Sequence, residues 1–86
     1  MVATPSRTAA RAYAFPSVIE HEEEHSWSVV FPDLPGCVTW GETHEDALVN
    51  AAEVATLHLR GLREKCSPIP KPSAALAGQE IVLVHV

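Results

Sequence analysis

Hydrophobic and polar residues alternate with a period of two in three short segments in the first half of the chain. Such alternation is typical of β-strands buried on one face, and it predicts strands at residues 13–20, 27–31 and 37–40. Apolar positions three and four residues apart then predict an amphipathic helix that begins after Thr43. Residues 81–86 are almost entirely apolar and predict a fourth strand. The order strand, strand, strand, helix, strand predicts an α+β fold, with one main helix across one face of an antiparallel-rich sheet.

Short-range signals support these elements. The polar residues 21–25 predict a hairpin connection between the first two strands. Pro35 and Gly36 fit the two central positions of a type II turn, because proline fixes φ and glycine accepts a positive φ. The hydroxyl of Thr43 can accept a hydrogen bond from the first turn of the helix, as an N-cap does. Pro16 lacks a backbone N–H, so we expect the first strand to lie at a sheet edge or to carry a bulge there.

The helix has one continuous apolar stripe. Small residues in the middle of the stripe predict that the helix lies close to the sheet. We expect Gly61 and residues 68–70 to bound the end of the helix, and residues 73–78 to form one short helical turn. Leu57 projects from the opposite side. The stripe consists of Leu48, Ala51, Ala52, Ala55, Leu59 and Leu62.

The apolar run at residues 81–86 allows two interpretations. A continuous run argues for burial on both faces of the strand, with the second cover supplied by a partner or a second copy. An ordinary C-terminal edge strand is the alternative. A domain of 86 residues buries only about 60% of its unfolded surface, so association would add stability. We therefore expect a homodimer or higher oligomer, with residues 1–11 as a flexible segment and residues 12–86 as one domain.

The charge of the chain is unevenly distributed. The formal net charge is −5, and no Lys or Arg occurs between Arg11 and Arg60. A nucleic-acid binder needs a basic footprint, so no direct contact with nucleic acid is expected. The segment would attract a basic protein, or it forms a solvated acidic face that aids solubility. Its nine carboxylates are Glu20, Glu22, Glu23, Glu24, Asp33, Glu42, Glu45, Asp46 and Glu53.

Few residues in the sequence are candidates for a metal-binding or catalytic site. His21 and His25 satisfy the H-E-x-x-H pattern of zinc proteases, but they lie between two predicted strands, whereas the zinc site requires a helix. Adventitious metal binding there, or a metal-dependent enzyme, remains an alternative. Cys37 fits a buried small hydrophobe better than a nucleophile. With Cys66 it forms no C-x-x-C pair, which argues against a disulfide framework and favours a reducing, cytoplasmic setting. We expect no catalytic residue, no metal, no cofactor and no enzymatic activity.

No apolar run approaches the ~18 residues of a membrane span, so no membrane contact is expected. One longer pattern is specific. The run SVVFPDLPGCVT at residues 28–39, followed by G-E-T and the helix, resembles the HicB antitoxin family, and the resemblance extends over residues 13–86. The positions that carry it are Phe31, Pro32, Asp33, Leu34, Pro35, Gly36, Gly41 and Thr43.

The resemblance implies a partial RNase H-like fold of β-β-β-α-β order. It also implies a partner, because HicB proteins bind and block HicA toxins, small basic ribonucleases that cleave messenger RNA. We expect Glu22, Glu23, Glu24 and Asp33 to contact the toxin from exposed connections, and the family-motif residues to be architectural. An orphan interaction or self-assembly module without a toxin is the alternative. Many HicB antitoxins continue into a DNA-binding domain, and none is expected here.

Overall fold

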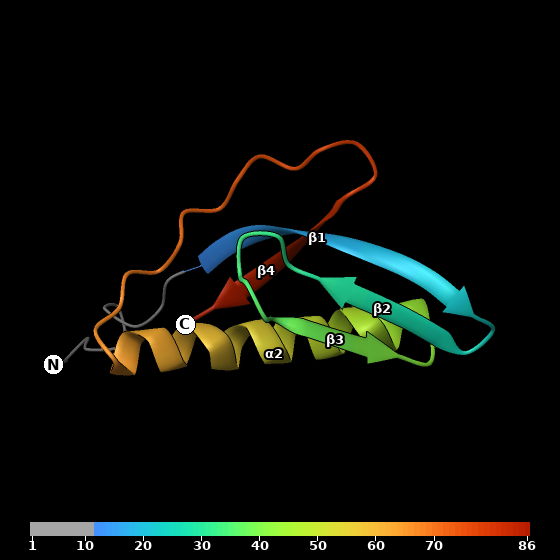
Figure 1. Ribbon diagram of the computed structural model, residues 1–86, viewed down its shortest axis with the longest axis horizontal. Helices are drawn as coiled ribbons and strands as arrows, with labels where there is room; N and C mark the ends of the chain where they lie inside the picture. The colour runs from blue at the N-terminus through green and yellow to red at the C-terminus, as the bar shows by residue number, and fades with distance from the viewer. Residues whose placement is uncertain (1–11) are drawn as a thin grey trace, which may run out of the picture.

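Four strands form one antiparallel sheet in the computed structural model, which describes residues 12–86 (Figure 1). The predicted flexible segment 1–11 lies outside the described residues. The strand order in the sheet is β3-β2-β1-β4, and the helix packs on one face. The predicted α+β order is confirmed. The elements are β1 (Ala12–Glu23), β2 (Ser26–Val30), β3 (Val38–Gly41), α2 (His44–Glu64) and β4 (Glu80–His85).

Strand β1 is long and changes its partner halfway along. Its first half, as far as Ser17, pairs with β4, and its second half, from Val18 onward, pairs with β2. Pro16 therefore has a neighbouring strand on one side only, which is a local sheet edge where a missing N–H is tolerated. The strand continues to Glu23, past the predicted end at residue 20. Because β2 begins at Ser26, only two residues remain for the hairpin turn.

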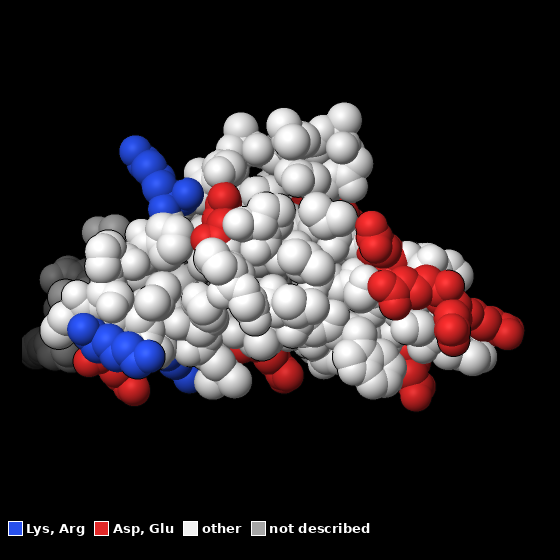
Figure 2. All heavy atoms as spheres, viewed as in Figure 1, with Lys and Arg blue, Asp and Glu red and all other residues white. Residues whose placement is uncertain are grey.

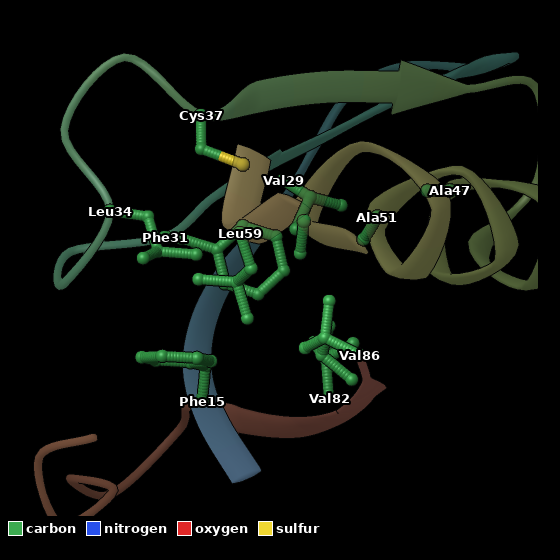
Figure 3. Close-up of a cluster of buried hydrophobic side chains, with 12 residues drawn as sticks. Phe15, Val29, Phe31, Leu34, Cys37, Ala47, Ala51, Leu59, Val82 and Val86 are labelled. Atoms are coloured by element: carbon green, nitrogen blue, oxygen red, sulfur yellow. The ribbon is translucent and has the colours of Figure 1, made fainter. Parts of the chain in front are cut away.

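The core lies between the sheet and α2 (Figure 3). The helix contributes a row of four buried residues spaced four apart, three of which are alanine: Ala47, Ala51, Ala55 and Leu59. The sheet and its loops contribute the larger groups, including Phe15 and Phe31. The prediction that small residues bring the helix close to the sheet is confirmed.

Both ends of α2 lie where the sequence analysis placed them. At the first, the N–H of Asp46 donates to the Thr43 hydroxyl at 3.0 Å, so the predicted N-cap is confirmed. At the second, the helix continues through Gly61 and ends at Glu64, between Gly61 and residues 68–70, which were expected to bound its end. A glycine inside a helix costs only about 1 kcal/mol relative to alanine, and packing of the flanking Leu59 and Leu62 against the sheet outweighs that cost.

The chain leaves the helix through a residue with positive φ. Cys66 has a φ of 58°, and the N–H of Ser67 donates to the carbonyl of Leu62 at 2.8 Å, which closes the last turn as a Schellman motif does. Residues 67–79 then form an extended connector (Figure 1). The expected helical turn at residues 73–78 is absent, since the connector contains only a turn in which Gln79 N–H donates to the Leu76 carbonyl.

Strand β4 is an edge strand with one buried face. Val82 and Val84 are buried against the core, whereas Ile81 and Leu83 are exposed on the other face. Of the two interpretations of this apolar run, the chain by itself forms the ordinary edge strand. Burial of both faces would require a further molecule, and that expectation stays a prediction.

Candidate protein-interaction surface

The β1–β2 hairpin carries a bulge that gathers carboxylates on one face. The pairing His21 with Trp27 and then Glu23 with Ser26 leaves Glu22 as the extra residue. Because paired residues share a face, the bulge brings Glu22 and Glu23 to the same side of the sheet, opposite α2. We call this side the outer face. The hydroxyl of Ser28, also on the outer face, donates to the Glu22 carboxylate at 3.2 Å.

The largest group of acidic side chains lies at one end of the molecule. Figure 2 shows this group around the hairpin and the basic side chains toward the opposite end, with further acidic side chains along the rest of the visible face. Glu24 lies in the turn, and like Glu22 and Glu23 it is exposed. Arg63 lies in the last turn of α2, and Lys65 is its C-cap residue. The predicted contact residues Glu22, Glu23 and Glu24 therefore lie together and are free to meet a partner.

The inner side of the same hairpin is aromatic. The rings of His21 and Trp27 stack with their centroids 4.0 Å apart, and His44 meets Trp27 edge-on at 5.1 Å. His44 Nε2 lies 2.6 Å from the Glu80 carboxylate, which links the start of α2 to the start of β4. This group holds the hairpin against the end of the helix.

The H-E-x-x-H pattern lies on a strand and its turn. His21 is engaged with Trp27, while His25 is exposed in the hairpin turn. As predicted, no helix presents these two imidazoles side by side. Within residues 12–86, no group of three or more His, Cys, Asp or Glu side chains could hold a metal ion.

Asp33 is held by a distant part of the chain. Its two carboxylate oxygens accept hydrogen bonds from the backbone N–H and the hydroxyl of Ser73, at 2.7 and 2.8 Å. The contact ties the loop between β2 and β3 to the connector. Asp33 thus lies apart from the hairpin carboxylates, and it has a structural role that the sequence did not indicate.

The remaining family-motif residues shape the loop and the sheet–helix contact. Phe31 and Leu34 are buried, and Leu34 N–H donates to the Phe31 carbonyl across Pro32. Pro35 and Gly36 form the next turn, in which Gly36 has a φ of 82° and Cys37 N–H donates to the Leu34 carbonyl at 2.9 Å. These bonds confirm the turn predicted there.

Gly41 marks the closest approach of the sheet to the helix. A Cβ atom at this position would lie 2.4 Å from the backbone nitrogen of Ala47. Real Cβ atoms do not approach backbone that closely, so only glycine fits without movement of the helix. The expected architectural role of this motif position has a direct physical cause.

The two cysteines are both free and differ in exposure. Cys37 is buried in the core, as predicted, and burial raises the pKa of its thiol. A raised pKa keeps the group protonated and a poor nucleophile. Cys66 is exposed at the end of α2.

Sequence reasoning missed three features of the surface. It did not find the His44–Glu80 contact or the Asp33–Ser73 contact, because both join residues more than thirty positions apart. It also assigned no role to Trp40, which is 56% exposed on the outer face. Period-two alternation places Val38 and Trp40 on one face of β3 and Cys37 and Thr39 on the other. This signal was present in the sequence, but the face with the larger apolar residues is ordinarily expected to be the buried one.

The fold and these contacts define a small α+β protein whose most distinctive surface is an acidic hairpin, a geometry suited to binding another protein. No helix among residues 12–86 is long and apolar enough to cross a membrane. Comparison with known proteins identifies the family. The family model described as HicB_like antitoxin of bacterial toxin-antitoxin system matches residues 15–80. The chain belongs to the HicB-like antitoxin family, which the sequence resemblance had predicted.

Individual similar proteins support this family assignment. The Antitoxin HicB 2 of Photorhabdus laumondii is 37% identical over 59 residues, which cover 69% of this chain and 42% of that protein. The UPF0150 protein Ta0767 of Thermoplasma acidophilum is 33% identical over 68 residues, which cover 79% of this chain and 91% of that protein. The match thus spans about two fifths of the Photorhabdus antitoxin, and 42% of a Haemophilus phage HP1 protein.

Solved structures show the same fold. The Burkholderia pseudomallei antitoxin HicB superimposes with a TM-score of 0.68 at 28% identity, over 85% of this chain and 62% of that chain. The N-terminal domain of the same antitoxin gives a TM-score of 0.69 at 28% identity, over 85% of this chain and 96% of the domain. The described fold therefore corresponds to the N-terminal domain of that antitoxin.

Proposed function

We propose that this chain is the antitoxin of a toxin–antitoxin pair and that it neutralises a HicA-type toxin by covering its active site. The observation that carries the proposal is membership of the HicB-like family across residues 15–80. The toxin is a small basic ribonuclease that cleaves messenger RNA, so the two proteins meet in the cytoplasm. The chain acts by binding, without catalysis of its own.

The charge of the hairpin supports a basic partner. Glu22, Glu23 and Glu24 are exposed at one end of the molecule, in a segment without a Lys or Arg. Such a surface speeds encounter with a positively charged protein and loses this advantage as salt is added. Asp33 contributes less to binding in this proposal, because Ser73 already occupies both of its carboxylate oxygens.

Coexpression tests the proposal. The chain is produced together with a small basic protein encoded in the neighbouring reading frame, and growth and copurification are measured. Relief of growth arrest and recovery of a complex are expected. Persistent arrest with no complex would refute the antitoxin function.

Charge variants then test the role of the hairpin. Replacing Glu22, Glu23 and Glu24 together by glutamine should slow association about tenfold at low salt, with little change at high salt. Glu53→Gln removes a carboxylate from an exposed position on α2 and serves as the control. Because Glu53→Gln removes one charge and the hairpin variant removes three, slowing by about twofold in Glu53→Gln would mean that only the net charge matters.

Self-assembly without a toxin is the second candidate function. The observation that favours it is the exposed apolar pair Ile81 and Leu83 on β4, which is also an edge of the sheet. An edge strand with an apolar face is a template for pairing with another copy. Sedimentation should show a dimer or higher oligomer that Leu83→Lys converts to monomer, and a monomer at micromolar concentration would exclude this candidate.

A further inference from the structure

The outer face carries an apolar row that crosses three strands. Val18 of β1 pairs with Val30 of β2, and Val30 pairs with Val38 of β3. All three lie on the side opposite α2, and Val30 and Val38 are exposed. The next row toward the hairpin is Trp40, Ser28 and Glu20. The outer face therefore changes from apolar to acidic over two rows.

A groove lies at this boundary. It has a volume of about 470 Å³ and is open to solvent. Trp40 and Val38 form its apolar wall, and Glu22 lies on the other side with the hydroxyls of Ser26 and Ser28. Trp40 is more than half exposed. An exposed tryptophan beside other exposed apolar groups is typical of a binding surface, because it leaves a large apolar area in water until a partner covers it.

The free edge of β3 is less suited to binding than its outer face. The side-chain amide of Asn50, on α2, donates to the Trp40 carbonyl at 2.9 Å. Addition of a partner strand to β3 would have to displace this bond. A partner that meets Trp40 and Val38 from the outer face leaves the bond intact.

The negative charges beside the groove favour a basic protein as the molecule that binds there. Glu20, Glu22 and Glu23 all lie on the outer face, and Ser28 holds the Glu22 carboxylate beside the groove. A second copy that bound through this same face, as in a two-fold symmetric dimer, would bring its own carboxylates against these three, which is repulsive. A basic protein can instead place Lys or Arg beside them.

We propose that the groove between Trp40 and Glu22 receives an apolar side chain of a basic protein partner, whose neighbouring Lys or Arg contacts Glu22 and Glu20. This inference rests on the proposed antitoxin function and deepens it, since it assigns toxin binding to the outer face of the sheet. Trp40 is the anchor, and the carboxylates orient the partner and speed its arrival.

The first test compares two exposed apolar residues on opposite sides of the molecule. Leu57 is 65% exposed on the solvent side of α2 and is the matched control for Trp40. The dissociation constant of the complex with the coexpressed basic toxin is measured by calorimetry. Trp40→Ser should weaken binding about 30-fold, and Leu57→Ser less than twofold. Trp40→Phe, which keeps an aromatic wall, should retain most of the affinity and separates loss of the anchor from a folding defect.

The outcomes distinguish this inference from the proposed function. A complex that forms normally with Trp40→Ser, or that is lost with Leu57→Ser, overturns the outer-face site while the antitoxin function stands. Failure of the unaltered chain to bind the toxin refutes both. A chain that is dimeric and becomes monomeric with Trp40→Ser would show that a second copy occupies the groove, which also overturns the inference.

Discussion

The two faces of strand β3 differ in the size of the side chains they present. Toward α2, strand β3 presents Gly41, which faces Ala47 of the helix, and both residues are buried. On the outer face the same strand presents Val38 and Trp40, both exposed. The helix approaches so closely that bulky groups are excluded from this contact. At β3, the side that meets the helix thus has the smaller residues, and the larger apolar groups of this strand lie exposed on the outer face.

The largest expected effect comes from truncating one apolar residue on each side. Leu59→Ala on the helix side should lower the free energy of unfolding by about 3 kcal/mol, because it opens a cavity among fully buried neighbours. Trp40→Ser on the outer face should cost less than about 1 kcal/mol, although tryptophan is larger. Urea unfolding of both variants measures the difference. A larger loss of stability for Trp40→Ser than for Leu59→Ala would contradict the conclusion that the helix side, and not the outer face, stabilises the fold.

A single methyl group tests how close the helix lies. Gly41→Ala should destabilise the protein by about 2 kcal/mol, because its Cβ would meet the backbone of Ala47 and push the helix away. Gly61→Ala is the matched control, since a Cβ there has no atom within 4 Å. It should stabilise the helix by about 0.5–1 kcal/mol. Thermal unfolding should therefore show shifts of opposite sign, and equal shifts would contradict the close approach.

The sequence predicted features that depend on neighbouring residues better than features that depend on contacts between distant elements. Element order, the Thr43 cap and the turn at Pro35 and Gly36 depend on neighbouring residues, and each was predicted correctly. The end of α2 lies between the predicted bounds, Gly61 and residues 68–70, but its exact position depends on Cys66, a residue other than glycine that adopts the positive φ closing the helix. The outward position of Trp40 was missed because it depends on the tight helix contact on the other face.

The same distinction applies to the predicted partner-contact residues: their exposure could be predicted from the sequence, but their arrangement could not. The hairpin carboxylates were expected on an exposed connection, and they are exposed, but their common face depends on the bulge at Glu22. Sequence alternation alone would place Glu22 and Glu23 on opposite faces. The engagement of Asp33 depends on Ser73, forty residues away, which no local pattern indicates.

Loss of the Asp33–Ser73 contact should have a smaller effect on stability than the changes at Leu59 and Gly41. Asp33→Ala should lower the free energy of unfolding by about 1 kcal/mol, because it removes two exposed hydrogen bonds to a carboxylate. Amide hydrogen exchange at Ser73 should accelerate, since its N–H loses its acceptor. Ser73→Ala keeps the backbone bond and should have about half the effect. Unchanged exchange in Asp33→Ala would show that the connector is held by other contacts.

The smallest expected effect lies at the end of α2, away from both faces. Cys66 has a φ of 58°, which a residue with a Cβ adopts at a cost of about 1 kcal/mol. Cys66→Gly removes this cost, and the greater freedom of glycine in the unfolded chain offsets part of the gain. A net stabilisation of about 0.5 kcal/mol is expected in urea unfolding. Cys66→Ala removes the thiol but keeps the Cβ, so it should give no gain. If the two variants were equally stabilised, the thiol rather than the backbone would be the cause, and the Schellman closure at Ser67 would carry no strain.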